Sequence, residues 1–391
     1  MKNMFTVLST LVIAWGCTAD DVTGPVATPQ SPDADQMVIA PDLEPFLGRG
    51  RMHRAGPLTI MTYNLYIGTD VDRVLASPPE EFDQRVQEAL GTFIATDYGE
   101  RSGAIADLIM EANPHVVGLQ EVWVVSTQGI AGVPDMTVDF LQILMAQLGA
   151  RGLNYQVVAQ EMLTQLQLPV GGGGVGLVDS DALLVRGDVP FDNTEAVVYQ
   201  AKLTVPFGPT MLDILRGYAA ADVRVGGKSY RVVSTHFEPQ QPNPQIQKDQ
   251  ANELLAALAD ANDPVIVVGD LNSGPADLDP DAPYNQLRAS HFTDAWLKRV
   301  PRGRRFDDPG YTCCQAADLQ NATSQLVERI DLIMVRNDFD FLPRSVVGPS
   351  WVEVVGDEQA DRTASGLWPS DHAGVVATFR LPTMRGLERN R

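Results

Sequence analysis

Residues 265–272 read Val-Ile-Val-Val-Gly-Asp-Leu-Asn. The four consecutive apolar residues predict a short strand buried on both faces, and this strand runs directly into a glycine, a carboxylate and an amide. Polar side chains at the end of a buried strand lie at the edge of a sheet, where loops carry many functional groups. This stretch therefore predicts both a sheet in the protein core and a chemically active edge of that sheet.

The same arrangement recurs along the chain. Polar residues that would be costly to bury follow several apolar strands, which favours one shared edge. The expected strands are 58–62, 116–119, 232–234, 265–268, 330–335 and 374–379, and amphipathic helices are expected around 82–93 and 251–258. The polar pieces beside them are Tyr63-Asn64, Gln120-Glu121, Thr235-His236, Asp270 with Asn272, Arg329-Ile330-Asp331 and Ser370-Asp371-His372.

In this order, the six pieces resemble the endonuclease/exonuclease/phosphatase superfamily, which includes deoxyribonuclease I, the apurinic endonucleases, bacterial sphingomyelinases and inositol polyphosphate phosphatases. The resemblance covers nearly all of residues 58–380. It implies an α+β fold, namely a four-layer α/β/β/α sandwich of two mixed β-sheets flanked by helices. It also implies an enzyme that hydrolyses phosphate esters with the help of a divalent cation.

The chemistry of such an enzyme needs a cation site. A phosphodiester resists attack because its oxygens are anionic, so a hydrolase must neutralise charge and supply an in-line nucleophile. The resemblance implies that Glu121, Asn64 and Asp371 hold the metal ion. We expect Mg²⁺, because hard cations prefer carboxylate and amide oxygens, with Mn²⁺ or Ca²⁺ as alternatives.

The resemblance also assigns catalytic roles. It implies that His372 is the general base that takes a proton from the attacking water, since imidazole titrates near neutral pH, and that Asp331 pairs with this histidine. Asp270 and Asn272 are expected to orient the water and bind the scissile phosphate. His236 is expected to donate to a phosphate oxygen, so His236 and Asn272 are the predicted substrate-phosphate residues.

The substrate stays open. The chain carries 29 Lys and Arg against 50 Asp and Glu, a net charge of -21, which weighs against long nucleic acids because affinity for phosphate backbones comes from clustered cations. Tyr66 stands where the apurinic endonucleases have a second acidic residue, which weighs against DNA repair. The remaining partners are a nucleic acid, a phospholipid or a phosphorylated small molecule, which includes an inositol or sugar phosphate cleaved by a phosphatase. A catalytically silent surface-binding module of the same fold is the alternative from another class.

The N-terminal residues predict export. Residues 1–16 combine a basic start with an apolar run that is short for a membrane span, and Ala14-Trp15-Gly16-Cys17 resembles the lipobox of bacterial lipoproteins. We therefore predict a signal peptide over 1–16 and a lipid anchor at Cys17, which would place the protein at the outer membrane, in the periplasm or on the cell surface; plain secretion is the alternative. Residues 17–56 predict a disordered tether, 57–382 the catalytic domain of a monomer, and 383–391 a polar tail.

Two further features allow two readings each. The apolar segment 205–215 predicts either an insertion packed on the domain or a hairpin that enters a membrane. The adjacent Cys313 and Cys314 could form a vicinal disulfide in an oxidising compartment or stay as thiols.

Overall fold

The computed structural model describes residues 57–207, 210–298, 308–336 and 349–379. The predicted signal peptide, Cys17, the tether and the polar tail lie outside the described residues, so they stay predictions. No helix in the part of the chain that the structure describes has the length and apolar character needed to cross a membrane.

One sheet has eight strands in the order β15-β16-β1-β2-β6-β3-β4, with β5 also paired to β6. It is mixed, because β1 runs parallel to β2 and antiparallel to β16. Its strands are β1 (Leu58–Asn64), β2 (Val116–Gln120), β3 (Val124–Gln128), β4 (Met136–Asp139), β5 (Tyr155–Val170), β6 (Gly173–Arg186), β15 (Pro349–Val355) and β16 (Gly374–Phe379).

The second sheet has six strands in the order β13-β14-β12-β11-β10-β7. It is mixed as well, because β11 and β12 are parallel whereas the other neighbours are antiparallel. Its strands are β7 (Phe191–Val198), β10 (Gly217–Val225), β11 (Lys228–His236), β12 (Val265–Asp270), β13 (Phe292–Asp294) and β14 (Asp331–Arg336). A separate hairpin is formed by β8 (Leu203–Phe207) and β9 (Thr210–Ile214).

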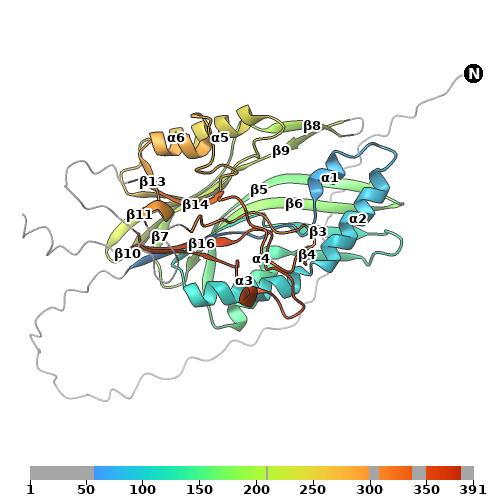
Figure 1. Ribbon diagram of the computed structural model, residues 1–391, viewed down its shortest axis with the longest axis horizontal. Coiled ribbons are helices and arrows are strands. Elements are labelled where there is room, and N and C mark those ends of the chain that lie inside the picture. Colours follow the sequence, from blue (N-terminus) through green and yellow to red (C-terminus); the bar gives the residue numbers. More distant parts are fainter. Residues whose placement is uncertain (1–56, 208–209, 299–307, 337–348, 380–391) are drawn as a thin grey trace, which may run out of the picture. The chain divides into compact units, whose positions relative to one another are not determined.

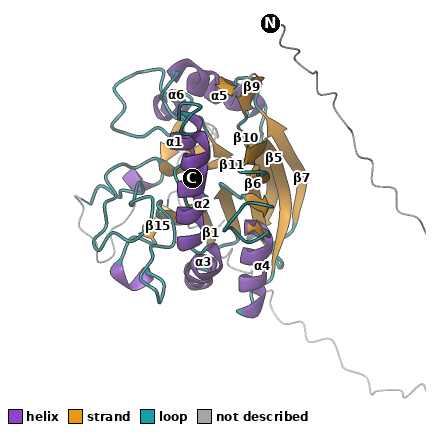
Figure 2. Cartoon of the chain, turned by 90° about the vertical axis from the view of Figure 1, so that its right-hand side faces the viewer, coloured by secondary structure: helices purple, strands orange, loops and turns teal. Residues whose placement is uncertain are grey.

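Helices cover the outer faces of both sheets (Figure 2). On the eight-stranded sheet lie α2 (Phe82–Ala95), α3 (Tyr98–Ala112) and α4 (Phe140–Ala150), and on the six-stranded sheet lie α5 (Pro244–Ala257) and α6 (Pro283–Ala289). A third cluster of buried residues fills the space between the sheets. The short α1 (Val71–Leu75) packs beside α2, and single 3₁₀ turns span Trp296–Lys298 and Gln359–Asp361. This is the predicted four-layer α/β/β/α sandwich with two mixed sheets, which is therefore confirmed (Figure 1).

The two sheets approach closely near Gly118 of β2. A Cβ at this position would lie 2.6 Å from Cγ2 of Val268 and 2.8 Å from the Ser234 hydroxyl oxygen, so only glycine lets the strands come this near. Beside it, Gln120 donates to the Ser234 hydroxyl at 2.9 Å and accepts a hydrogen bond from Thr62 at 3.1 Å. The amide of Gln120 therefore joins the two sheets with its polar atoms satisfied.

Several observed elements begin or end differently from the expected ones. The strand β16 has the predicted bounds, while β1, β2 and β12 continue into the polar residues that follow their apolar runs. The helix α5 starts earlier than expected, because Asn243 caps it by accepting from the backbone N–H of Gln245, and Pro244 occupies its first turn. The eight strands β3 to β10, together with β13 and β15, were not predicted.

Candidate active site

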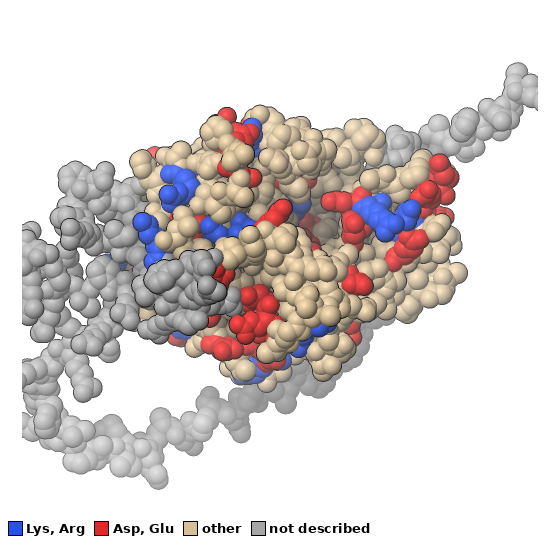
Figure 3. All heavy atoms as spheres, in the orientation of Figure 1, with Lys and Arg blue, Asp and Glu red and all other residues tan. Residues whose placement is uncertain are grey.

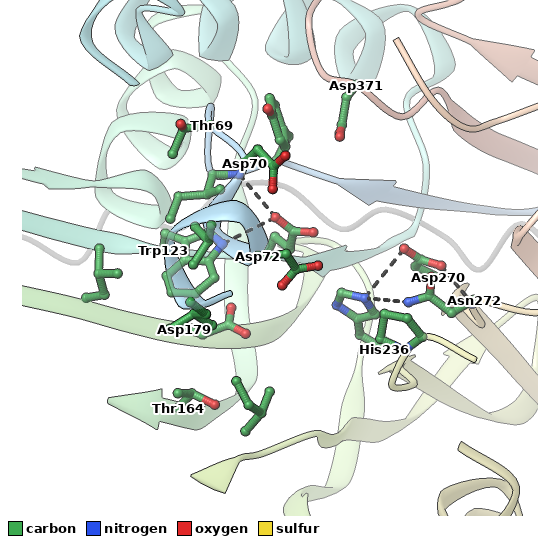
Figure 4. Close-up of a pocket in the computed structure, with 18 of the residues that line it drawn as sticks. Thr69, Asp70, Asp72, Trp123, Thr164, Asp179, His236, Asp270, Asn272 and Asp371 are labelled. Atoms are coloured by element: carbon green, nitrogen blue, oxygen red, sulfur yellow. Dashed lines mark hydrogen bonds and ion pairs between the residues drawn. The ribbon is translucent and has the colours of Figure 1, made fainter. Parts of the chain in front are cut away.

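The eight predicted site residues meet at one edge of the two sheets. Six of them line a cavity of about 330 Å³, and the other two, Asn64 and Asp331, are fully buried beside it. Figure 4 shows His236, Asp270 and Asn272 grouped on one side of this cavity. The pairing of β12 brings Asp270 opposite both His236 and Asp331. Asn64 ends β1, Glu121 follows β2, His236 ends β11, Asp270 ends β12, Asn272 comes two residues later, Asp331 begins β14, and Asp371 and His372 precede β16.

His372 and Asp331 form a buried pair. Nδ1 of His372 lies 2.8 Å from Oδ2 of Asp331 and donates to this carboxylate, so the neutral ring carries its lone pair on Nε2. Nε2 lies 3.8 Å from Asp270 Oδ2 and 3.9 Å from Asp371 Oδ1. Burial lowers the pKa of His372, but the negative charges of these three carboxylates outweigh it and raise this pKa well above its ordinary value.

The backbone conformation at the end of β12 requires the glycine of the Gly-Asp-Leu-Asn stretch. Gly269 adopts a φ of +144°, and a Cβ there would overlap the carbonyl oxygen of Thr235, 1.8 Å away. One residue later, Asp270 accepts the backbone N–H of Asn272 at 2.8 Å, which holds both side chains at the strand end. Burial, together with the charge of Asp331, raises the pKa of Asp270 to about 6.

His236 is held in one tautomer by a residue that the sequence did not single out. Its Nδ1 lies 3.0 Å from a guanidinium nitrogen of Arg216. A guanidinium only donates, so Nδ1 must accept, and the neutral ring carries its proton on Nε2. Burial and the charge of Arg216 both lower the pKa of His236 well below its ordinary value, which keeps the ring neutral.

The Nε2–H group of His236 and the amide of Asn272 then form a pair of donors. Nε2 lies 3.1 Å from the Asn272 side-chain nitrogen and 3.5 Å from Asp270 Oδ2. The same Asn272 nitrogen also donates to the carbonyl oxygen of Phe237 at 2.9 Å, which fixes the orientation of its amide. Both nitrogens carry hydrogens in this tautomer, so their 3.1 Å contact is not a hydrogen bond between them. An oxygen of a phosphate group could accept from both donors.

Acidic residues that line the cavity also fit a cation. Burial and the negative charge of Glu121 together raise the pKa of Asp371 to about 7, although His372 opposes this shift. A divalent ion between two such carboxylates would relieve this repulsion. Glu121 is held by the backbone N–H of Ile67 at 3.1 Å and by the indole N–H of Trp123 at 3.3 Å.

Both ends of the Asn64 side-chain amide are hydrogen-bonded to neighbouring residues. Its oxygen accepts the backbone N–H of Tyr66 at 2.9 Å, and its nitrogen donates to Glu121 Oε1 at 3.1 Å and to Asp270 Oδ2 at 3.2 Å. The amide thus bridges two carboxylates that belong to different sheets. A second group of possible ligand atoms, from Asp270, Asp331 and His372, lies within 4.8 Å of one another.

Two buried arginines position the site and were missed by the sequence reading. Arg216, between β9 and β10, donates to Glu238 at 3.0 Å and lies 3.8 Å from Asp179. Arg101 of α3 is fully buried and donates to the carbonyl oxygens of Leu65 and Pro369, each at 2.9 Å, and to that of Tyr66 at 3.0 Å. It therefore ties the loop that follows Asn64 to the loop that carries Asp371. A single arginine among ordinary residues carries no sequence signal, because only tertiary contacts give it this role.

The loop that holds the two cysteines runs alongside Asp371 and His372. The backbone N–H of Gln315 donates to the carbonyl oxygen of Asp371 at 2.8 Å, and that of Ala373 donates to Thr312 at 2.7 Å. Cys313 and Cys314, whose state the sequence left open, are joined as a disulfide, and Sγ of Cys314 lies 4.0 Å from Nε2 of His372.

The fold and the site together define the class of deoxyribonuclease I-like phosphoester hydrolases. The model of the Endonuclease/Exonuclease/phosphatase family matches residues 61–372, and the chain belongs to this family. Membership points to phosphoester hydrolysis in general, in a family that generally depends on divalent metal ions.

Several solved structures are similar to the chain, whereas no curated protein sequence matches it. The endonuclease/exonuclease/phosphatase from Bacteroides vulgatus is 18% identical, with a TM-score of 0.50 over 84% of this chain and 100% of that chain. The family protein from Leptotrichia buccalis is 14% identical, also with a TM-score of 0.50, over 82% of this chain and 99% of that chain. A mannosyl-6-phosphatase from Bacteroides thetaiotaomicron is 15% identical, with a TM-score of 0.48. The match covers 82% of this chain and 99% of that chain. The first two show the fold.

Proposed function

We propose that the protein is an exported Mg²⁺-dependent phosphodiesterase, tethered to a membrane by a lipid at Cys17, that hydrolyses its substrate by in-line attack of water. The observation that carries the hydrolytic part is the buried His372–Asp331 pair, with an Nδ1–Oδ2 distance of 2.8 Å, at the wall of a cavity that also holds two phosphate-directed donors. Export and tethering are supported by the sequence of residues 1–17.

The residues of the chain divide the work as follows. In the neutral form of His372, Nε2 accepts the proton of the attacking water, and Asp331 stabilises the imidazolium that results. Asp270 orients the water, while the Nε2–H of His236 and the amide of Asn272 bind the phosphate. A bound Mg²⁺ at Glu121 and Asp371 would supply positive charge to the phosphate oxygens.

The charge of the cavity favours a diester over a monoester. Among the described residues, six carboxylates line it against one guanidinium, that of Arg216. A phosphodiester carries one negative charge, whereas a monoester carries nearly two at neutral pH. The singly charged ester is therefore repelled less by these carboxylates.

The His372→Ala variant tests this function. With bis(p-nitrophenyl) phosphate and Mg²⁺, we expect kcat to fall by about 10²–10⁴-fold, with little change in the thermal unfolding temperature. EDTA should abolish cleavage by the unmodified protein. The matched control is His291→Asn, because this histidine lies outside the cavity and adopts a φ of +67°, which asparagine tolerates.

Two results would contradict the proposal. Near-normal turnover by His372→Ala would remove this histidine from the mechanism. Faster hydrolysis of p-nitrophenyl phosphate than of the diester would instead favour a phosphatase for inositol or sugar phosphates.

A further inference from the structure

The active-site cavity extends beyond the catalytic residues into a part that is lined mostly by apolar side chains, together with Thr164 and Asp179 (Figure 4). Figure 4 places Trp123 and Thr164 on the side of the cavity away from His236 and Asp270. We call the apolar side chains of this part the apolar arm. They come from α1, from the segment after β2, and from β5, β6 and β9, and they are Val71, Trp123, Leu166, Leu177, Leu212 and Ile214.

The β8–β9 hairpin forms one wall of the apolar arm. Side chains alternate between the two faces of a strand, so Leu212 and Ile214 share a face, and both line the cavity. Met211 belongs to the opposite face of β9 and is 61% exposed. The apolar segment 205–215, for which the sequence allowed either a packed insertion or a membrane hairpin, therefore directs part of its apolar surface toward the active site.

The apolar arm offers no free positive charge to a second anionic group. The guanidinium of Arg216, the one Arg or Lys side chain among the described residues that line the cavity, already contacts Glu238 and His236 at 3.0 Å each. Asp70 and Asp72 stand exposed at the cavity rim. Acidic side chains are also spread over the face of the molecule drawn in Figure 3. A second phosphate, as in a polynucleotide, would meet negative charge here.

We propose that the apolar arm binds an uncharged alkyl chain of the substrate's alcohol group, next to the scissile phosphate. The substrates are then phosphodiesters of apolar alcohols and not nucleic acids. This inference rests on the proposed function for the position of the phosphate. The cavity supports it directly, because the apolar side chains and the His236–Asn272 donor pair line one continuous space.

A binding experiment tests the apolar arm without turnover. Methyl-alkyl phosphinates carry one negative charge and have no ester bond to hydrolyse, and their alkyl group can be lengthened from methyl to hexyl. In the presence of Mg²⁺, isothermal titration should show affinity rising up to about fourfold per added methylene, the gain expected for full burial of each group. The Leu212→Asn variant should lose at least about tenfold of the hexyl-over-methyl preference.

Met211→Asn is the matched control, because it makes the same chemical change on the other face of the same strand. It should keep the full chain-length dependence. Leu166→Asn, on β5, repeats the test on a wall that does not belong to the hairpin. Affinity that is independent of chain length, or equal losses in Leu212→Asn and Met211→Asn, would overturn the apolar arm.

Kinetics separates this inference from the proposed function. Hexyl p-nitrophenyl phosphate should be hydrolysed with a kcat/KM at least about tenfold above that of the methyl ester, and above that of thymidine p-nitrophenyl phosphate. Equal values for the hexyl and methyl esters, or a preference for the thymidine ester, would refute the apolar arm and leave the phosphodiesterase standing. Chain-length-dependent binding of phosphinates without hydrolysis of any diester would refute the phosphodiesterase and leave the apolar arm standing.

Discussion

At the scale of single residues, the site depends on which nitrogen of each histidine carries the proton. Asp331 accepts from Nδ1 of His372, and Arg216 donates to Nδ1 of His236. When both rings are neutral, they therefore present opposite groups to the cavity: His372 presents a lone pair, and His236 presents an N–H group. Histidine thus serves as a base at one position and as a donor to phosphate at the other, depending on which residue contacts its Nδ1.

Replacement of Arg216 by methionine should release the tautomer of His236. Methionine cannot donate to Nδ1, so we expect protonation to shift from Nε2 to Nδ1 in a large fraction of molecules, and kcat for the diester to fall by about 10–100-fold. A long-range ¹H–¹⁵N correlation spectrum reports the protonated nitrogen directly. Arg216→Lys should restore part of the wild-type signal and activity. A His236 ring that keeps its proton on Nε2 in Arg216→Met would show that Arg216 does not set the tautomer.

At the scale of elements, the strand ends were predictable and the middle of the chain was not. The runs that became β2 and β12 are apolar, short and followed by polar residues, so both the element and the site residue could be read from the sequence. The long β5 breaks its alternation twice, with register shifts between Val157 and Ala159 and between Met162 and Gln165. Bulges of this kind interrupt the period of two on which strand prediction depends.

The site residues, like the strands, were predictable only in part. Residues at strand ends, such as Asp270 and His236, could be predicted because the topology of the sheet brings such ends together. Arg101 could not, because α3 carries it to loops distant in the sequence, and its role depends on four hydrogen bonds to backbone carbonyls.

Arg101 should be the strongest single link between α3 and the active-site loops. In Arg101→Met, these carbonyl groups lose a charged donor in a buried setting, and we expect the free energy of unfolding to fall by roughly 3–5 kcal/mol. Urea unfolding measures this loss. Arg224→Met is a suitable control, because its ion pair with Asp192 lies at the surface and should contribute less than about 1 kcal/mol. A loss of less than about 1 kcal/mol in Arg101→Met would contradict this role.

At the scale of the whole molecule, an acidic residue is buried between the two sheets. Glu161 of β5 is 3% exposed, and a Cβ built on Gly217 of β10 would lie 2.3 Å from both of its carboxylate oxygens. Neither oxygen has a hydrogen-bond partner among the described residues. Burial, together with the charge of Asp181, raises the pKa of Glu161 to about 9. The folded protein therefore holds a proton here that the unfolded chain releases at a much lower pH.

This difference gives the stability of the protein a defined dependence on pH. The unfolded chain loses the Glu161 proton near its ordinary pKa, which is about 4.3 for a glutamate, whereas the folded protein keeps it until about pH 9. Between these values the unfolded state binds fewer protons, so this residue makes the free energy of unfolding fall as pH rises.

The Glu161→Gln variant tests this dependence. Its side chain cannot ionise, so the variant should be more stable than the unmodified protein by about 1–3 kcal/mol at pH 8, with a smaller difference at pH 5. Urea unfolding at both pH values measures it, and Glu80→Gln, at an exposed position, should show no such difference. A Glu161→Gln protein that is less stable at pH 8 would mean that the carboxylate is ionised and compensated between the sheets.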